Sequence, residues 1–201
     1  MAKYNNETLN PGEHFIYNEI EFICLDIIDG NYLAMTAKPW KELPFDVNSR
    51  NGCWHTSNRY NNDWRKSSLR HVLHNDFLNL LGFKYLVEQT SDLIADNGDR
   101  AYGTCGDYVT ILSCDQYRKY RDFVPLFDEW MWTLTPWGCH DDLVDSARVV
   151  GTDGGLYDDL VINDYGVAPV CLFSSKNLKL CRQTHLVRLD EHDEGVDEDG
   201  E

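Results

Sequence analysis

The chain has 201 residues, of which 34 are acidic and 18 basic, so its formal net charge is −16 with histidine neutral. This charge argues against direct affinity for nucleic acid or for an anionic membrane surface. Hydrophobic residues make up 42% of the chain, enough for one sizeable core, and no segment approaches the roughly 18 uninterrupted apolar residues that a membrane helix needs. We therefore expect a globular protein that does not span a membrane.

Seven cysteines are scattered along the chain without Cys-x-x-Cys spacing, and the polar N-terminus lacks the apolar core of a signal peptide. An odd number of cysteines without an export signal indicates reduced thiols. We expect a cytoplasmic location.

The first part of the chain predicts an antiparallel meander that follows a short arm, residues 1–11. Three short apolar runs are separated by polar pairs, and Asp29-Gly30 between two of them is a strong hairpin signal because the turn needs positive φ. The runs cover residues 15–17, 20–28 and 32–37. Residues 38–63 contain two prolines, several asparagines and no sustained periodicity, which predicts a long surface connection.

Two central helices are expected next. Ser67 is a capping residue, Gly82 is a stop signal, and the apolar residues between them fall on one helical face: Leu69, Val72, Leu73, Phe77, Leu80 and Leu81. Arg70 lies on the same helix, and we expect it to tie the helix to backbone carbonyls of the sheet or loops. A strand at 108–112 then leads into a short helix that ends near Tyr120, because Ser113 and Gln116 have capping-box spacing.

Four later runs are short, β-rich and separated by Gly, Asp and Pro, and they predict strands of one compact sheet system: residues 130–134, 147–150, 156–162 and 167–173. Strands, central helices and further strands without βαβ alternation indicate the α+β class, with a single domain over residues 12–189. The last twelve residues contain eight acids and no lysine or arginine. Such composition predicts a disordered acidic tail, residues 190–201.

Five local patterns occur in the order found in a known domain family: Trp64-x-x-Ser67-x-Leu69-Arg70-x-x-Leu73-x-x-x-Phe77, Ile111-Leu112-Ser113 with Tyr117, Trp130-x-Trp132-x-x-x-Pro136, Asp153-Gly154 and Gly166-Val167-x-Pro169. Over about residues 12–175 the chain resembles an uncharacterised family of Firmicutes, gut-bacterial surface proteins and their phages. The resemblance implies a C-type-lectin-like fold, related in architecture to the formylglycine-generating domain. It also implies the host cytosol as the location if the protein is phage-encoded.

The chain departs from the family pattern at two positions. In the family the tryptophan-containing strand usually continues Leu-Arg-Ser-Pro and a later segment reads Gly-Val-Arg-Pro. Here the two segments read Trp132-Thr133-Leu134-Thr135-Pro136 and Gly166-Val167-Ala168-Pro169, so both customary arginines are missing. If those arginines help to build a polar site, this chain has lost or altered it. Gly166 and Pro169 are kept, so the implied fold is unaffected.

The six tryptophans divide into two groups. We expect Trp64, Trp130 and Trp132 to pack in the core, because they lie on the predicted helix and strand. The loop tryptophans are Trp40, Trp54 and Trp137. They either anchor a binding partner or pack beneath the loops, since an exposed ring offers much contact area at small entropic cost.

Metal ligands occur in the sequence, but their spacing is not that of known sites. Cys53 with His55 and Cys139 with His140 lack the spacing of zinc-ligand hairpins. Calcium needs oxygen ligands, which either Asp141, Asp142 and Asp145 or Asp153, Asp158 and Asp159 could supply. We expect solvated acidic loops at the first of these places, facing a partner, and neither a metal nor another cofactor.

These features favour a non-catalytic binding protein that displays loops 38–63, 96–106 and 136–146 to a macromolecular partner, protein or glycan. The alternative is an acidic, phage-encoded inhibitor of a host defence nuclease that mimics nucleic acid, such as an anti-CRISPR. A more remote alternative is a cysteine-dependent oxidase-like enzyme. The formylglycine-generating relatives use late cysteines, and here these are Cys171 and Cys181.

Overall fold

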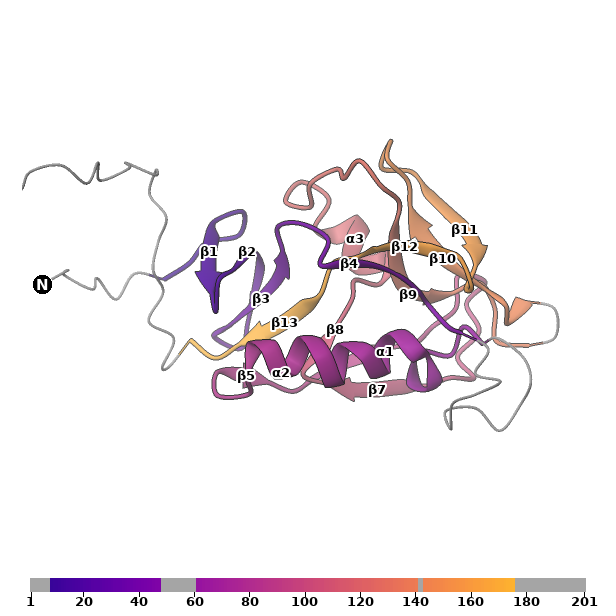
Figure 1. Cartoon of the computed structure of the whole chain (residues 1–201), viewed down its shortest axis with the longest axis horizontal. Coiled ribbons are helices and arrows are strands. Elements are labelled where there is room, and N and C mark those ends of the chain that lie inside the picture. Colours follow the sequence, from indigo (N-terminus) through magenta and orange to yellow (C-terminus); the bar gives the residue numbers. More distant parts are fainter. Residues whose placement is uncertain (1–7, 48–60, 141–142, 176–201) are drawn as a thin grey trace, which may run out of the picture.

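A computed structural model describes residues 8–47, 61–140 and 143–175. The described chain is an α+β protein with mostly antiparallel strands arranged in three sheets (Figure 1). Leu9, within the expected arm, is fully buried in the core, so the packed structure includes residues before position 12. The expected acidic tail, residues 190–201, lies outside the described residues.

The first sheet contains the predicted meander. Its strand order is β1-β2-β3-β13-β5, and β8 also pairs with β13. The strands are β1 (His14–Tyr17), β2 (Ile20–Ile28), β3 (Asn31–Thr36), β5 (Leu86–Val87), β8 (Val109–Thr110) and β13 (Val170–Phe173). The predicted turn between β2 and β3 is confirmed, since Asp29 and Gly30 have φ of 50° and 75°. Antiparallel pairing joins Asn31 to Ile28 directly across this turn.

The second sheet has the strand order β11-β10-β9-β12-β4. Its strands are β4 (Lys41–Pro44), β9 (Met131–Pro136), β10 (Ser146–Val150), β11 (Leu156–Leu160) and β12 (Asp164–Val167). The four late runs therefore do not form one sheet system: the run at 167–173 is divided between β12 here and β13 in the first sheet. The two halves separate at Ala168 and Pro169, where the chain passes from one sheet to the other.

The segment expected to be a long surface connection, 38–63, also differs from the prediction. Its residues 41–44 form β4, which pairs antiparallel with β12 more than a hundred residues later. Phe45 follows β4 and is fully buried, with its ring against Trp64 and Trp132 at centroid distances of 5.9 and 5.6 Å. Long-range pairing, which local periodicity does not report, therefore places this segment in the core.

The main helical segment begins as a 3-10 turn, η1 (Trp64–Lys66), and continues through α1 (Ser68–Val72), η2 (Leu73–Phe77) and α2 (Leu78–Leu81). The Ser67 side chain caps α1 by accepting a hydrogen bond from the Arg70 amide at 3.1 Å. Gly82 ends the segment with φ of 76°. Both the predicted cap and the predicted stop are confirmed, and the segment runs along one side of the molecule with α1 against β4 and η2 against β8 (Figure 1).

The η2 turn is a π-helix, and it changes the buried face of the segment. A π turn holds more residues than an α turn, so the buried positions shift along the segment: Leu69, Leu73, Phe77 and Leu81 are each 1% exposed or less, and Leu78 is 2% exposed. Leu80, expected on this face, is instead 55% exposed. Val72, expected there too, is only half-buried.

The second helix, α3 (Cys114–Lys119), confirms the predicted capping box. The Ser113 hydroxyl accepts from the Gln116 amide at 3.1 Å, and the Gln116 side chain accepts from the Ser113 amide at 3.0 Å.

A third sheet, not predicted from the sequence, pairs β6 (Gln89–Asp92) with β7 (Thr104–Asp107).

The tryptophans expected in the core are not equally buried. Trp64 and Trp132 are fully buried, and the Trp132 indole donates to the Leu43 carbonyl at 2.9 Å. Trp130 is only partly buried and precedes β9, with its ring stacked between Tyr157 and Tyr165. Within the described residues, no helix is both long and apolar enough to cross a membrane.

Candidate functional site at the loop end

Described parts of the three expected display loops meet at one end of the molecule, which we call the loop end: residues 61–63, 94–103, 137–140 and 143–145. Asn62 joins them, although it is fully buried. Its side-chain nitrogen lies 3.0, 2.9 and 2.7 Å from the carbonyl oxygens of Gly138, Leu143 and Ser146, and its side-chain oxygen accepts from the Tyr102 hydroxyl at 2.8 Å. Both the nitrogen and the oxygen of this buried amide have hydrogen-bond partners, and these bonds fix the loops in one arrangement.

Further contacts hold the loops against each other. The Asp96 amide donates to the Pro136 carbonyl at 2.9 Å, and the His140 ring lies 3.2 Å from the Asp99 carboxylate. Gly138 is required by close approach, because a Cβ there would lie 2.7 Å from the Leu143 side chain. These contacts hold the described parts of the loops together.

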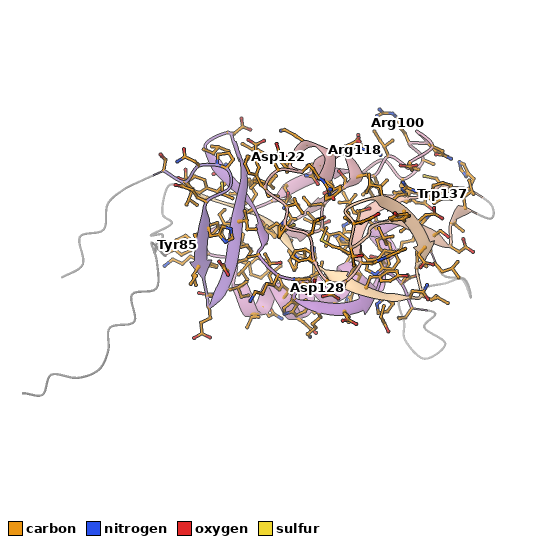
Figure 2. The ribbon with its side chains drawn as sticks, turned by 90° about the horizontal axis from the view of Figure 1, so that it is seen from above. Tyr85, Arg100, Arg118, Asp122, Asp128 and Trp137 are labelled. Atoms are coloured by element: carbon orange, nitrogen blue, oxygen red, sulfur yellow. The ribbon has the colours of Figure 1, made fainter. Side chains whose placement is uncertain are left out.

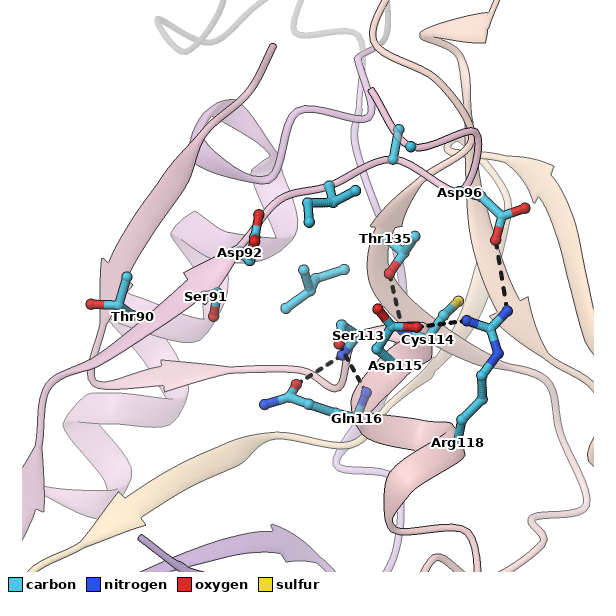
Figure 3. A pocket seen from close by; sticks show the side chains of 14 residues that line it. Thr90, Ser91, Asp92, Asp96, Ser113, Cys114, Asp115, Gln116, Arg118 and Thr135 are labelled. Carbon is cyan, nitrogen blue, oxygen red and sulfur yellow. Dashed lines mark hydrogen bonds and ion pairs between the residues drawn. The ribbon is translucent and has the colours of Figure 1, made fainter. Parts of the chain in front are cut away.

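A pocket of about 390 Å³ lies beside these loops, between β6, the segment after it, β9 and the start of α3 (Figure 3). Its walls are partly apolar, and their polar residues include Asp92, Asp96, Ser113, Asp115, Arg118 and Thr135. Figure 3 shows Arg118 reaching from α3 towards two carboxylates on the same side of the pocket. It donates to Asp115 at 2.7 Å and lies 3.9 Å from Asp96.

The Asp96 carboxylate is shared between two guanidinium groups. Besides Arg118, the Arg148 side chain lies 3.6 Å from Asp96, and only 11% of it is exposed. The Arg148 guanidinium also lies over the Trp137 ring at 5.2 Å, a cation–π distance. Trp137 is thus half-buried on a fixed cation, with the rest of its ring at the surface.

The pocket is suited to binding polar or charged groups of a ligand or partner. The pocket offers carboxylates, hydroxyls and one guanidinium that is half-exposed and easily displaced, since exposed ion pairs contribute little stability. Cys114 is the thiol in the lining, and it is buried with its sulfur 3.6 Å from the Thr133 hydroxyl. No histidine lies among the lining residues to act as its base.

The other predicted binding residues lie in different places. Trp40 is half-buried against Phe77, with a ring distance of 5.2 Å, and does not line this pocket. Asp145 is exposed at the loop end, where its carboxylate accepts from the Ser146 hydroxyl. Trp54, Asp141 and Asp142 lie outside the described residues.

Arg70 has the structural role predicted for it, but its acceptor is a buried carboxylate and not a set of carbonyls. It donates to Asp107 at 2.8 Å through Nε and lies 2.6 Å away through Nη2. The Trp64 indole also donates to Asp107 at 2.8 Å, and the His74 ring lies 3.0 Å from it. Asp107 therefore fastens the helical segment to β7.

Gly166 lies in β12 and Pro169 lies where the chain passes from β12 to β13, and both are buried. A Cβ at Gly166 would lie 3.0 Å from the Glu129 carboxyl carbon, so this position has little room for a side chain. The Pro169 carbonyl accepts from the Thr36 amide at 3.0 Å.

Three important polar residues were not singled out in the sequence: Asn62, Asp96 and Asp107. Asn62 and its neighbour Asp63 stand just before a predicted helix, where Asn and Asp are expected to cap, and Asp63 does accept from the Arg65 amide at 3.2 Å. Asp96 and Asp107 carry no such local signal. Their partners come from elements far apart in the chain.

Burial affects the pKa of four of the described cysteines. Burial raises the pKa of Cys24 and Cys105 to about 11, with Asp107 adding to the effect on Cys105. Burial also raises the pKa of Cys139 and of Cys171, which lies in β13 as predicted. A raised pKa disfavours the thiolate, which is the reactive form of cysteine. Cys181 lies outside the described residues.

The candidate calcium ligands Asp153, Asp158 and Asp159 all have partners in the described chain, and Asp158 lies 3.5 Å from the Arg148 guanidinium. Asp153 accepts from the Gly155 amide and the Tyr157 hydroxyl, and Asp159 accepts from the Tyr165 hydroxyl. Across residues 8–47, 61–140 and 143–175, no three His, Cys, Asp or Glu side chains are grouped as metal ligands. Cys53, His55, Asp141 and Asp142 are not among those residues.

No family model, curated protein or solved structure matches this chain. The family resemblance thus rests on the sequence motifs alone.

Proposed function

We propose that this protein is a non-catalytic binding protein that presents the loop end to a protein partner. The observation that carries the proposal is the buried Asn62 amide, which fixes three loops in one arrangement before any partner arrives. A surface ordered in advance loses less entropy on binding, and such preorganisation raises affinity. The half-exposed ring of Trp137 supplies an aromatic anchor beside it.

The charges of the loop end favour a partner surface with basic groups. Asp92, Asp96 and Asp115 surround the pocket, and Arg118 is the cation in its lining. A partner lysine or arginine that replaced Arg118 would meet carboxylates already facing the pocket. The overall negative charge of the chain would speed the encounter.

We also propose a C-type-lectin-like scaffold in the cytoplasm. In support, an early strand, β3, pairs with the last described strand, β13, and the binding loops gather at one end. The free thiols of Cys24, Cys105, Cys114, Cys139 and Cys171 fit a reducing compartment.

The test is affinity capture from host lysate followed by mass spectrometry, with the full chain as bait and two loop-end variants, Trp137→Ala and Asp115→Asn. Asp128→Asn is the matched control, since Asp128 is exposed and lies away from Arg100 and Trp137 (Figure 2). We expect one protein to be captured by the wild type and the control. Trp137→Ala should weaken its binding about 30-fold, or about 2 kcal/mol.

Thermal melts of each variant separate binding from folding. Equal capture by all four baits would contradict the proposal. So would turnover of a substrate by the purified chain.

A further inference from the structure

The molecule contains two tight hairpin turns of the same kind, with different residues at the same position. The β2–β3 turn has Asp29 and Gly30 at φ of 50° and 75°, and the β1–β2 turn has Asn18 and Glu19 at φ of 47° and 66°. Both central residues of such a turn need positive φ, so Asn-Gly and Asp-Gly are the favoured pairs. Glycine would adopt this backbone conformation without strain, whereas Glu19 adopts it with strain.

No hydrogen bond or ion pair of the described structure involves the Glu19 side chain. The turn is held in place by its neighbour, because the Asn18 side chain donates to the Leu81 carbonyl at 2.8 Å. Glu19 is exposed, and its carboxylate has no ion-pair or hydrogen-bond partner among the described residues. Backbone strain that the packing does not require points to a role for the side chain that causes it.

Glu19 lies at the edge of a second cavity, of about 370 Å³, which we call the Trp40 groove. The groove is formed by the β1–β2 turn and the segment after β3, and it shares no lining residue with the loop-end pocket. Trp40 forms part of its wall, with Pro39 beside it. The predicted recognition role of Trp40 thus falls on this groove.

The polar groups of the groove have unused binding capacity. Lys38 is exposed and, like Glu19, has no partner in the described chain, and the two are not within the 4.0 Å of an ion pair. Glu21 differs, since its carboxylate is bonded to the His14 ring at 2.8 Å. The Thr36 hydroxyl, also in the wall, is buried and has no hydrogen-bond partner among the residues that the structure describes.

We propose that the Trp40 groove binds a small zwitterion of the amino-acid class. Glu19 takes its ammonium group, Lys38 takes its carboxylate, and Trp40 contacts its apolar part. Two opposite charges that face one cavity without pairing are complementary to a ligand that carries both charges. An ammonium group beside an indole also gains from the ring, as the Lys41 ammonium 4.2 Å from the Trp40 ring already does.

The first test titrates the ¹⁵N-labelled full chain with glycine betaine, L-leucine and L-tryptophan at millimolar concentrations. Methyl glucoside and an N-acetyl amino-acid amide are the uncharged comparisons. We expect the zwitterions alone to shift the amide signals of Ile20, Lys38 and Trp40, with dissociation constants of about 1 mM. Shifts with methyl glucoside alone, or with no probe, would overturn the proposal.

The second test uses Glu19→Gly, which removes the carboxylate and the strain together. Its melting temperature should rise by about 2–4 °C while the zwitterion shifts disappear. The matched control is Asp29→Gly, the same kind of change in the other hairpin turn, which should leave the shifts unchanged. Retained binding in Glu19→Gly, or a fall in its melting temperature, would contradict the role assigned to Glu19.

Discussion

Single buried polar residues connect elements of this molecule that lie far apart in the chain. Asp107 is 1% exposed and receives hydrogen bonds from the indole of Trp64 and the guanidinium of Arg70, with His74 beside it. Removal of the carboxylate would take away the hydrogen-bond acceptor of the Trp64 indole and the ion-pair partner of the Arg70 guanidinium. A buried charge network that is complete stabilises the fold, and one that is broken destabilises it strongly.

We predict that Asp107→Ala lowers the free energy of unfolding by about 3–5 kcal/mol, because it leaves a partly buried arginine and a buried indole N–H unpaired. Denaturant unfolding followed by circular dichroism measures the change. Asp76→Ala is the control: its carboxylate is 57% exposed and lies 3.9 Å from Lys41, so its loss should change stability by less than about 0.5 kcal/mol. Equal effects of the two substitutions would contradict the assigned role of Asp107.

The same carboxylate gives the stability a pH dependence. Burial by itself would raise the pKa of Asp107, but hydrogen bonds from His74, Arg70 and Trp64 outweigh burial and hold the pKa below its ordinary value. The unfolded chain then binds the proton more readily, so this stability is present above the unfolded pKa of about 3.9 and is lost as pH falls through the folded pKa.

We therefore expect the free energy of unfolding to fall as pH is lowered below about 4. Urea titrations at a series of pH values measure this. In Asp107→Asn the fall should be smaller, because the titrating group is gone. A variant with the same acid dependence as the wild type would show that other carboxylates account for it.

At the scale of elements, local signals in the sequence predicted local structure. The Asp29-Gly30 turn, the Ser67 cap, the Gly82 stop and the Ser113–Gln116 capping box are all present, because each depends on residues within a few positions. Short strands paired over long distances were not predicted, and β4 is the clearest case. Four residues carry too little periodicity, and the partner strand β12 lies more than a hundred residues away.

The π turn is a second feature that the sequence did not reveal, and it leads to a prediction. Leu73 is fully buried and Leu80 is 55% exposed on the same helical segment. Leu73→Ala should cost about 2–5 kcal/mol, whereas the matched Leu80→Ala should cost less than about 0.5 kcal/mol. Denaturant unfolding of both variants is the measurement; similar losses would mean that the buried face is the regular α-helical one.

The candidate site shows the same division between local and long-range information. Loop positions of Trp40, Trp137 and Asp145 were visible in the sequence, because loops lack periodicity. The sequence did not show that Trp40 lies at one groove while Trp137 and Asp145 lie at the loop end. This separation depends on where the fold places β4 and the segment after β6. Asn62 was missed because a buried amide has no pattern in the chain until its three carbonyl partners are known.

For the molecule as a whole, the excess of acids is the dominant electrostatic feature. Several carboxylates have structural partners inside the fold, as Asp46, Asp63 and Asp107 show. The nucleic-acid mimic considered from the sequence stays a prediction that depends on the remaining, exposed acids.

We predict that raising the ionic strength from about 0.01 M to about 0.15 M increases the melting temperature by a few degrees, because salt screens the self-repulsion of a chain with net charge −16. Differential scanning calorimetry in sodium chloride measures it. Sucrose at matched osmolality is the control. An unchanged or lower melting temperature would indicate that attractive ion pairs dominate.

The position of the last two described strands has a consequence for biosynthesis. β12 lies between β9 and β4, and β13 lies between β3 and β5, so in each large sheet the last of the described strands to be made is an internal one. A nascent chain on the ribosome has the edges of β3 and β4 unpaired until residues 164–173 have emerged. The two sheets are thus completed together, after translation has passed these strands, and a chain released earlier exposes open edges in both.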